Sequence, residues 1–154
     1  MLNFCPKLFN RLFKKGKEDS MFHAAVAIIY NDKNEVLILK RSDDSESYPG
    51  YWNFPGGGPE NDETPEQCVS REVFEETSLM IKPEDFYYLD VLEKEGTDKH
   101  IWFFIYEGAV DNVEIDEESS EHKWVKTSKL FDYKMIPTPE YLLRVIGIWG
   151  GNIT

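Results

Sequence analysis

The sequence predicts an α/β sandwich formed by one domain. Segments rich in β-branched and aromatic residues lie before and after one strongly signalled helix, and an amphipathic helical segment closes the chain. Of the 154 residues, 41% are apolar and 14% are aromatic, which is enough for one substantial core. We therefore expect a single domain at residues 21–154, preceded by a basic extension at residues 1–20.

The extension at residues 1–20 differs in composition from the rest of the chain. Leu8, Phe9, Leu12 and Phe13 alternate with lysine and arginine at helical spacing. An amphipathic helix of this kind suits an anionic membrane surface or a partner protein. Because the segment is short, we prefer a helical appendage of the domain, and membrane contact is the less favoured alternative.

A β-hairpin is expected at the start of the domain. Residues 22–30 (FHAAVAIIY) and 35–41 (EVLILKR) have strand composition, and the turn-forming residues 31–34 (NDKN) separate them. Residues 42–50 are polar and are expected to form a loop beside a pocket. Arg41, at the end of the second strand, would contact either a substrate phosphate or the nearby acids, and the sequence leaves both alternatives open.

An aromatic and glycine-rich stretch leads into the first strong helix. Trp52 and Phe54 would either stack on a nucleobase or belong to the core, as aromatic residues beside a loop more often do. Glycine permits tight turns and close backbone approach. The loop around Gly57 can therefore bring its backbone near a phosphate or a metal ion.

The helix that follows has clear signals at its start. Thr64 stands at the N-cap position, Pro65 follows at the first helical position, and Gln67 is placed to complete a capping box. The spacing predicts a helix from Pro65 with Val69 and Val73 facing the core.

Three glutamates crowd one side of this helix near its end. Glu72, Glu75 and Glu76 repel one another and oppose the negative end of the helix dipole. Arg71 lies one turn before Glu75 and can pair with it, but one guanidinium cannot neutralise three carboxylates. Hard oxygen ligands clustered in this way suit Mg²⁺ or Mn²⁺. The alternative is an ordinary solvated helix face.

The spacing of these residues resembles a known family signature. Five residues separate Gly57 from Glu63, seven separate Glu63 from Arg71, and residues 71–79 read REVFEETSL. This is similar to the signature of the Nudix hydrolases, G-x5-E-x7-R-E-U-x-E-E-x-G-U, where U is aliphatic. Eight of its nine specified positions match. The departure is Ser78 in place of glycine, at a helix end where a left-handed backbone is expected.

The resemblance implies a Nudix-type α/β/α sandwich with a mixed central sheet. It also implies hydrolysis of a diphosphate linkage in a nucleoside diphosphate derivative. Glu72, Glu75 and Glu76 would bind Mg²⁺ or Mn²⁺, Glu63 would assist through water or a salt bridge, and Arg71 would orient a carboxylate. The metal would neutralise phosphate oxygens and activate a water molecule that attacks phosphorus.

The signature does not select the substrate. A MutT-like nucleoside triphosphate pyrophosphatase is favoured because the chain is small and its GGG stretch resembles that group. A nucleotide-sugar hydrolase, a dinucleoside-polyphosphate hydrolase and a non-catalytic nucleotide-sensing module are the alternatives. Residues 42–52 and 111–122 are the loops expected to choose the base and the leaving group.

More strands and a final helix are expected after the glutamates. Pro83 is expected to stop the helix within a loop, and residues 86–95 and 100–110 read as a strand pair with two apolar faces. A short turn at residues 127–130 and a helix at residues 139–149 complete the domain.

The acidic segment at residues 111–126 is a second place for chemistry. An acidic loop is expected to run into a short strand at residues 123–126. In the family that this chain resembles, a carboxylate beyond the signature frequently binds a metal or activates water. Glu121 is the first candidate for this role and Glu118 is the second. The alternative is a solvated acidic loop.

Charge and cysteine content limit the partners. The net charge of −12 argues against an extended nucleic-acid surface, although metal ions can bring phosphates to an acidic protein. Cys5 and Cys68 form no disulfide framework, which favours a reducing compartment and a cytoplasmic location. No apolar run is long enough to cross a bilayer. The oligomeric state is open, with a homodimer as one alternative.

Overall fold

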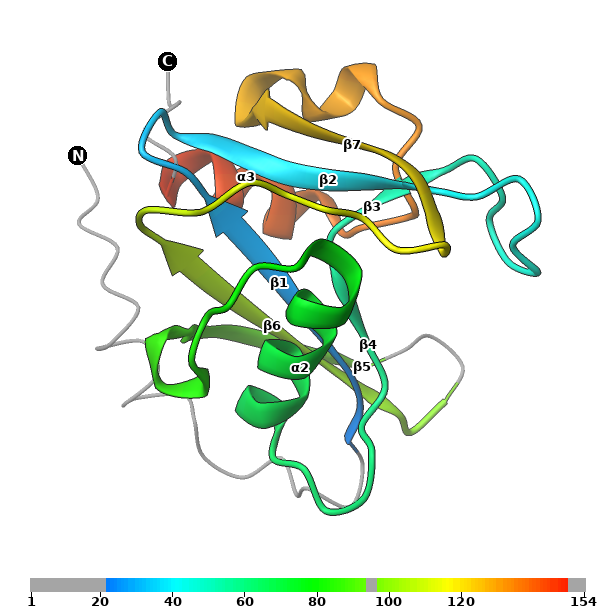
Figure 1. Cartoon of the computed structure of the whole chain (residues 1–154), viewed down its shortest axis with the longest axis vertical. Coiled ribbons are helices and arrows are strands. Elements are labelled where there is room, and N and C mark those ends of the chain that lie inside the picture. The colour runs from blue at the N-terminus through cyan, green and yellow to red at the C-terminus, as the bar shows by residue number, and fades with distance from the viewer. Residues whose placement is uncertain (1–21, 94–96, 150–154) are drawn as a thin grey trace.

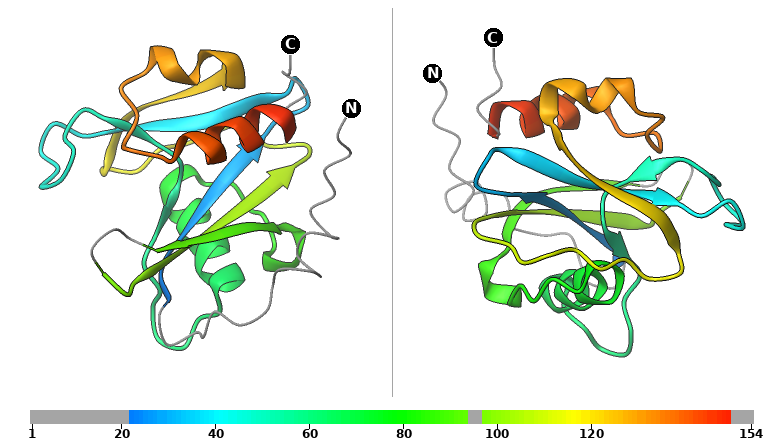
Figure 2. Two further views of the ribbon diagram at one scale, coloured as in Figure 1. Left: turned by 180° about the vertical axis from the view of Figure 1, so that it is seen from behind. Right: turned by 45° about the horizontal axis from the view of Figure 1, so that its top comes forward.

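A mixed β-sheet lies between two helices in the computed structural model, which describes residues 22–93 and 97–149 (Figure 1). Helix α2 (Pro65–Thr77) covers one face of the sheet and α3 (Glu140–Trp149) covers the other (Figures 1 and 2). The predicted α/β/α sandwich is confirmed. The expected extension at residues 1–20 lies outside the described residues.

Strand β1 (Phe22–Tyr30) is the centre of the sheet. It runs parallel to β6 (His100–Glu107) over its whole length. A turn at residues 31–34 connects it to the antiparallel strand β2 (Glu35–Arg41), as the sequence predicts. The short strand β4 (Gly56–Gly57) pairs with the first half of β1 and delivers the chain to α2.

Three further strands extend the sheet within the described part of the chain. Strand β5 (Tyr87–Glu93) pairs with β6 in antiparallel fashion, which confirms the predicted strand pair. The short strand β3 (Trp52–Asn53) and the long strand β7 (Ser119–Lys126) pair with β2. Strand β7 begins earlier than predicted, because backbone pairing with β2 extends through polar residues that carry no apolar strand pattern.

Alternating side chains of β6 build the two halves of the core. Trp102 and Phe104 pack in the cluster beneath α2, whereas Phe103 and Ile105 pack in the cluster beneath α3. Both faces of the strand are therefore apolar, as expected for a strand covered by helices on each side.

Helix α2 has the predicted start and the predicted end. The Thr64 side chain accepts from the Gln67 N–H while the Gln67 side chain accepts from the Thr64 N–H, which confirms the capping box. The helix ends at Thr77, and Ser78 adopts the expected left-handed backbone at φ 64° and ψ 9°. Pro83, which was expected as the stop, lies beyond this end and begins a short 3₁₀ turn, Pro83–Asp85.

Helix α3 follows the 3₁₀ segment Thr127–Asp132 and closes the chain over the sheet. Leu142 and Ile146 are fully buried beneath it. The buried hydroxyl of Tyr30 donates to the carbonyl oxygen of Ile146. This bond joins the C-terminal helix to the central strand. No helix of the described residues has the length and hydrophobicity needed to cross a bilayer.

Replacing Tyr30 with phenylalanine tests how α3 is held. Tyr30→Phe removes one buried hydrogen bond and leaves the ring, so the free energy of unfolding should fall by about 0.5–1.5 kcal/mol in urea denaturation. The exposed Tyr48 is the matched control, and Tyr48→Phe should change stability by less than about 0.5 kcal/mol. Equal effects of the two variants would contradict this account of α3 docking.

Candidate active site

Two glycines let the main chain of β4 lie directly against the glutamates of α2. A Cβ atom on Gly57 would lie 2.6 Å from the Cδ and Oε1 atoms of Glu72. Approach of this backbone to a phosphate or a metal ion stays a prediction. A Cβ atom on Gly56 would lie 2.4 Å from the carbonyl oxygen of Ala25. The Gly56 N–H donates to Oε1 of Glu76 at 3.3 Å. Only glycine fits both positions without displacing a neighbour.

The guanidinium of Arg71 connects the loop before α2 to the glutamates on the helix. Its Nε and Nη2 atoms donate to the two oxygens of Glu63 at 2.8 and 3.0 Å, and Nη2 also donates to the Gly58 carbonyl at 2.8 Å. Its Nη1 atom donates to Glu72 and to Glu75, both at 3.0 Å. The predicted pairing of Arg71 with Glu75 is confirmed. Arg71 therefore orients three carboxylates at once, and its Nε atom also lies 3.6 Å from the carboxylate of a fourth glutamate, Glu60.

The contacts of Arg71 and the burial of the side chains shift the pKa values of these carboxylates in different directions. The hydrogen bond from Arg71 lowers the pKa of Glu63. The same contact with Glu63 raises the pKa of Arg71, which stays charged. Glu63 is therefore an anion committed to structure rather than a free acid or base.

Glu76 is the most buried of the helix glutamates, with 6% of its surface exposed. Burial, and after it the charge of Glu72, raises its pKa to about 9, although the hydrogen bond from the Gly56 N–H acts in the opposite direction. Burial also raises the pKa of Glu72, against the lowering effect of Arg71. Two neighbouring carboxylates that resist ionisation together are stabilised as anions when a cation lies beside them.

The donor set fits a hard divalent cation. Glu72, Glu75 and Glu76, here called the carboxylate cluster, offer oxygens from consecutive turns of one helix. Within the described residues, Arg71 forms ion pairs with Glu72 and Glu75 and not with Glu76. Across residues 22–93 and 97–149, no three acidic, histidine or cysteine side chains already converge as ligands. Arg71 instead holds Glu72 and Glu75. Binding of Mg²⁺ or Mn²⁺ by the cluster stays a prediction.

The structure distinguishes the two candidates in the acidic segment. Glu121, which was expected in a loop, lies within β7 opposite Lys40 and has its carboxylate 3.9 Å from Nζ of Lys123. Glu118 lies just before β7, and its charge contributes to the raised pKa of Glu76. The two candidates therefore differ in position, and which of them acts in catalysis stays a prediction.

Arg41 forms hydrogen bonds with the loop that follows it, rather than an ion pair with an acidic side chain of the described residues. Its Nε atom donates to the Ser47 carbonyl at 2.8 Å, and Nη2 donates to the hydroxyls of Ser45 and Ser47 at 2.5 and 3.3 Å. The guanidinium thus braces the loop at residues 42–50. A contact between Arg41 and a substrate phosphate stays a prediction.

The aromatic residues before the glycines belong mainly to the core. Trp52 and Phe54 are 7% and 5% exposed. The Trp52 ring packs edge-on against Tyr133 with centroids 5.3 Å apart. Phe54, however, also lines a cavity of about 250 Å³ together with Gly56 and Gly57. Stacking on a nucleobase stays a prediction for both residues, and only Phe54 of the two lines this cavity.

This cavity lies on the face of the sheet opposite α2. Apolar side chains of β1 and β6 form its floor, including Val26 and Phe103. Asn53 and Thr138 supply polar groups at its edge. Gly56 and Gly57 separate this cavity from the carboxylate cluster. An apolar space with a few polar groups suits a small ligand with a flat ring.

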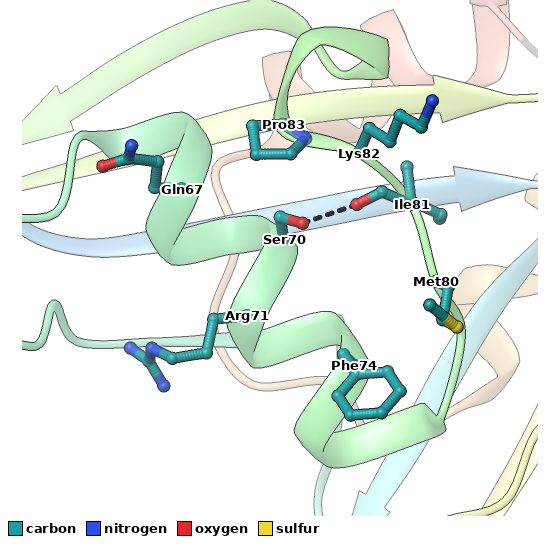
Figure 3. Close-up of a pocket in the computed structure, with 8 residues that line it drawn as sticks. All are labelled: Gln67, Ser70, Arg71, Phe74, Met80, Ile81, Lys82 and Pro83. Carbon is teal, nitrogen blue, oxygen red and sulfur yellow. Dashed lines mark hydrogen bonds between the residues drawn. The ribbon is translucent and has the colours of Figure 1, made fainter.

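A larger groove of about 490 Å³ lies on the outer side of α2 (Figure 3). Phe74 and Met80 are its exposed apolar residues, at 50% and 85% exposure. The Ser70 hydroxyl donates to the Ile81 carbonyl across its floor, and the guanidinium of Arg71 points away from this groove. Its lining contains no acidic side chain, so it lacks the ligands for phosphate chemistry through a metal.

The fold and this loop–helix arrangement together define an α/β/α protein of the Nudix class. The chain belongs to the NUDIX domain family, whose model matches residues 21–145.

Named relatives support the same family. The chain is 44% identical to the 8-oxo-dGTP diphosphatase of Escherichia coli K12 over 85 residues, which is 54% of this chain and 64% of that protein. It is 29% identical to the nucleoside triphosphatase NudI of Escherichia coli O139:H28 over 132 residues, covering 79% and 93% of the two chains. The crystal structure of the MutT protein from Methanosarcina mazei Go1 superposes with a TM-score of 0.61 at 27% identity, covering 86% and 96%.

Replacing Glu76 with glutamine should stabilise the metal-free protein. The folded-state pKa of Glu76 lies above its ordinary value of 4.5, at about 9, so the folded state holds this proton more tightly than the unfolded chain does. The stability due to the protonated form is complete below pH 4.5 and is lost as the pH rises through about 9.

Urea denaturation in EDTA measures this effect. The wild-type free energy of unfolding should fall between pH 6 and pH 9, and Glu76→Gln should flatten that fall and add about 1–3 kcal/mol at pH 9. The exposed Glu84 provides the control, because Glu84→Gln should leave the slope unchanged. A glutamine variant that is less stable at pH 9 than the wild type would contradict the burial argument.

The two glycines of β4 should respond differently to an added methyl group. Gly56→Ala meets backbone and should destabilise the protein by about 1–3 kcal/mol or more, whereas Gly57→Ala meets the movable end of Glu72 and should mainly weaken Mn²⁺ binding. Gly147→Ala, which meets nothing within 4 Å on α3, should stabilise the protein by about 0.5–1 kcal/mol. Thermal melts and calorimetric Mn²⁺ titration would check all three variants. Identical behaviour of the Gly56 and Gly57 variants would contradict the different surroundings assigned to the two glycines.

Proposed function

We propose that this protein is a metal-dependent nucleoside triphosphate pyrophosphohydrolase of MutT type. The observation that carries the proposal is the buried Glu76 carboxylate beside Glu72, reached by the glycine main chain of β4 and ordered by Arg71. The relatives named as an 8-oxo-dGTP diphosphatase and a nucleoside triphosphatase support this substrate class. The aligned part spans 64% of the first relative, so its whole activity is carried over here as a proposal.

The carboxylate cluster would hold Mg²⁺, or Mn²⁺ in its place. When bound, the ion supplies charge neutralisation at the phosphate oxygens and acidifies a water molecule. Arg71 holds two members of the cluster, Glu72 and Glu75, in fixed orientations. The Gly56 N–H donates to Glu76 and fixes the direction of its carboxylate. The protein thereby provides a preorganised set of oxygens rather than a covalent nucleophile.

Glu118 would accept the proton of the attacking water. Water adds to a phosphorus atom of the triphosphate, the bridging P–O bond breaks, and pyrophosphate leaves with the bridging oxygen to give a nucleoside monophosphate. A carboxylate close to Glu76 but outside the ligand set is suited to this proton transfer. Glu121, the first candidate from the sequence, is the alternative; it lies within β7, with its charge partly offset by Lys123.

The nucleoside would occupy the cavity of about 250 Å³ on the other side of β4. Phe54 would contact the base, and Asn53 and Thr138 would offer hydrogen bonds to its edge. An oxidised guanine nucleotide is the specific candidate, because the first relative is named for 8-oxo-dGTP. A nucleotide sugar, a dinucleoside polyphosphate or a purely sensing role are the alternatives. The cysteine content favours action in the cytoplasm.

A nucleotide panel with Mg²⁺ tests the proposed activity. Pyrophosphate release should be highest with a nucleoside triphosphate, and Glu76→Gln should lower kcat on the order of 100-fold or more, since the cluster loses a charged ligand. Glu66→Gln, at the other end of the same helix, should retain wild-type kcat within about threefold. Turnover that survives in Glu76→Gln, or a wild type inactive on the whole panel, would overturn the proposal.

A further inference from the structure

The end of α2 is fastened to the acidic segment at two neighbouring points. The Glu114 N–H donates to the Thr77 carbonyl at 2.9 Å, which satisfies one of the last carbonyls of the helix. The hydroxyl of Ser78 donates to the Glu114 carbonyl at 3.2 Å. Glu114 is thus held through both of its backbone polar groups, one by the helix and one by the cap residue.

The other end of this segment is attached to the sheet. The Ser42 N–H, just beyond β2, donates to the Glu118 carbonyl at 3.0 Å. Between the two attachments, the Asp116 carboxylate accepts from the Glu118 N–H at 3.1 Å, and Ile115 packs against the core cluster beneath α2. The span from Glu114 to Glu118 is short, so the position of one end constrains the other.

Ser78 accepts a backbone conformation that glycine adopts more easily. Its φ of 64° lies in the left-handed region, where a Cβ atom is unfavourable. The family signature has glycine here, and glycine would provide the same turn without a hydroxyl. The serine therefore contributes one thing that glycine cannot, the hydrogen bond to Glu114.

We propose that Ser78 is a positioning residue whose hydroxyl fixes the place of Glu118 by fastening residues 114–118 to the end of α2, the helix that carries the carboxylate cluster. The inference rests on the proposed function, because it assigns Ser78 to the carboxylate that takes the proton of water. The geometry of the two attachments carries it.

Kinetics of Ser78 variants separate positioning from simple helix capping. Ser78→Gly removes the hydroxyl and relieves the backbone, so the melting temperature should be maintained or rise while kcat falls about two- to tenfold, the equivalent of one neutral hydrogen bond. KM should change less than about twofold, because residues 114–118 do not line the cavity proposed for the nucleoside. Ser78→Asn tolerates the left-handed backbone and restores a donor, so it should recover part of kcat. If capping were the only role, Ser78→Gly would match or exceed the wild type.

A double-mutant cycle with Glu118→Gln tests whether Ser78 affects kcat through Glu118. The Ser78→Gly effect on kcat should disappear in the Glu118→Gln background, since the residue being positioned no longer acts. Ser128→Ala on the 3₁₀ segment is the control for loss of an exposed hydroxyl and should leave kcat unchanged. Additive effects of the Ser78 and Glu118 changes would overturn the proposal.

Amide hydrogen exchange of the metal-free protein gives a readout without turnover. Ser78→Gly should accelerate exchange at the amides of Glu114 and Ser42 by about two- to tenfold and leave strand β1 unchanged. Unchanged exchange at both amides would overturn the fastening itself. A normal Glu118→Gln enzyme beside an inactive Glu76→Gln enzyme would overturn the role of Ser78 but leave the proposed hydrolysis intact, whereas a wild type inactive on all nucleotides would overturn both.

Discussion

The contact of the Arg71 guanidinium with four glutamates and a backbone carbonyl is the interaction on which the site depends. Residues 58–63 have no strand or helix of their own, and the two-pronged bond to Glu63 with the bond to Gly58 holds them against α2. The same group offsets the repulsion between Glu72 and Glu75. Lysine could not replace it, because an ammonium group lacks the planar arrangement of donors that these contacts use.

Apolar packing supports the burial of a carboxylate in this site. Val69, Val73 and Glu76 follow one another at helical spacing on the same side of α2, and all three are buried. The two valines pack the helix against the sheet, and the third buried residue on this side is the acid Glu76. The energy gained from the two valines offsets the cost of removing Glu76 from water, which is why the helix remains docked with an unfavourable group beneath it.

Local sequence patterns predicted most of the fold. The features that they did not predict depend on contacts between segments far apart in the sequence. The hairpin of β1 and β2, the start of α2 and the two-faced strand β6 depend on neighbouring residues, and the sequence predicted each of them. The place of Glu121 within a strand rather than a loop depends on where β7 begins, which the register with β2 determines. The bracing role of Arg41 required the path of residues 42–50. The burial of Glu76 could have been inferred from its place on the same side of α2 as the two valines.

Gly56 and Gly57 limit how this protein can change its specificity over evolutionary time. The two residues line the cavity on one side of the sheet and contact Glu72 and Glu76 on the other, so a single stretch of main chain is the partition between them. Side chains added there would disturb ligand fit and catalytic acids together. Adaptation to a new base must therefore proceed through the remaining rim, at Asn53 and residues 136–138, where substitutions leave the acids untouched.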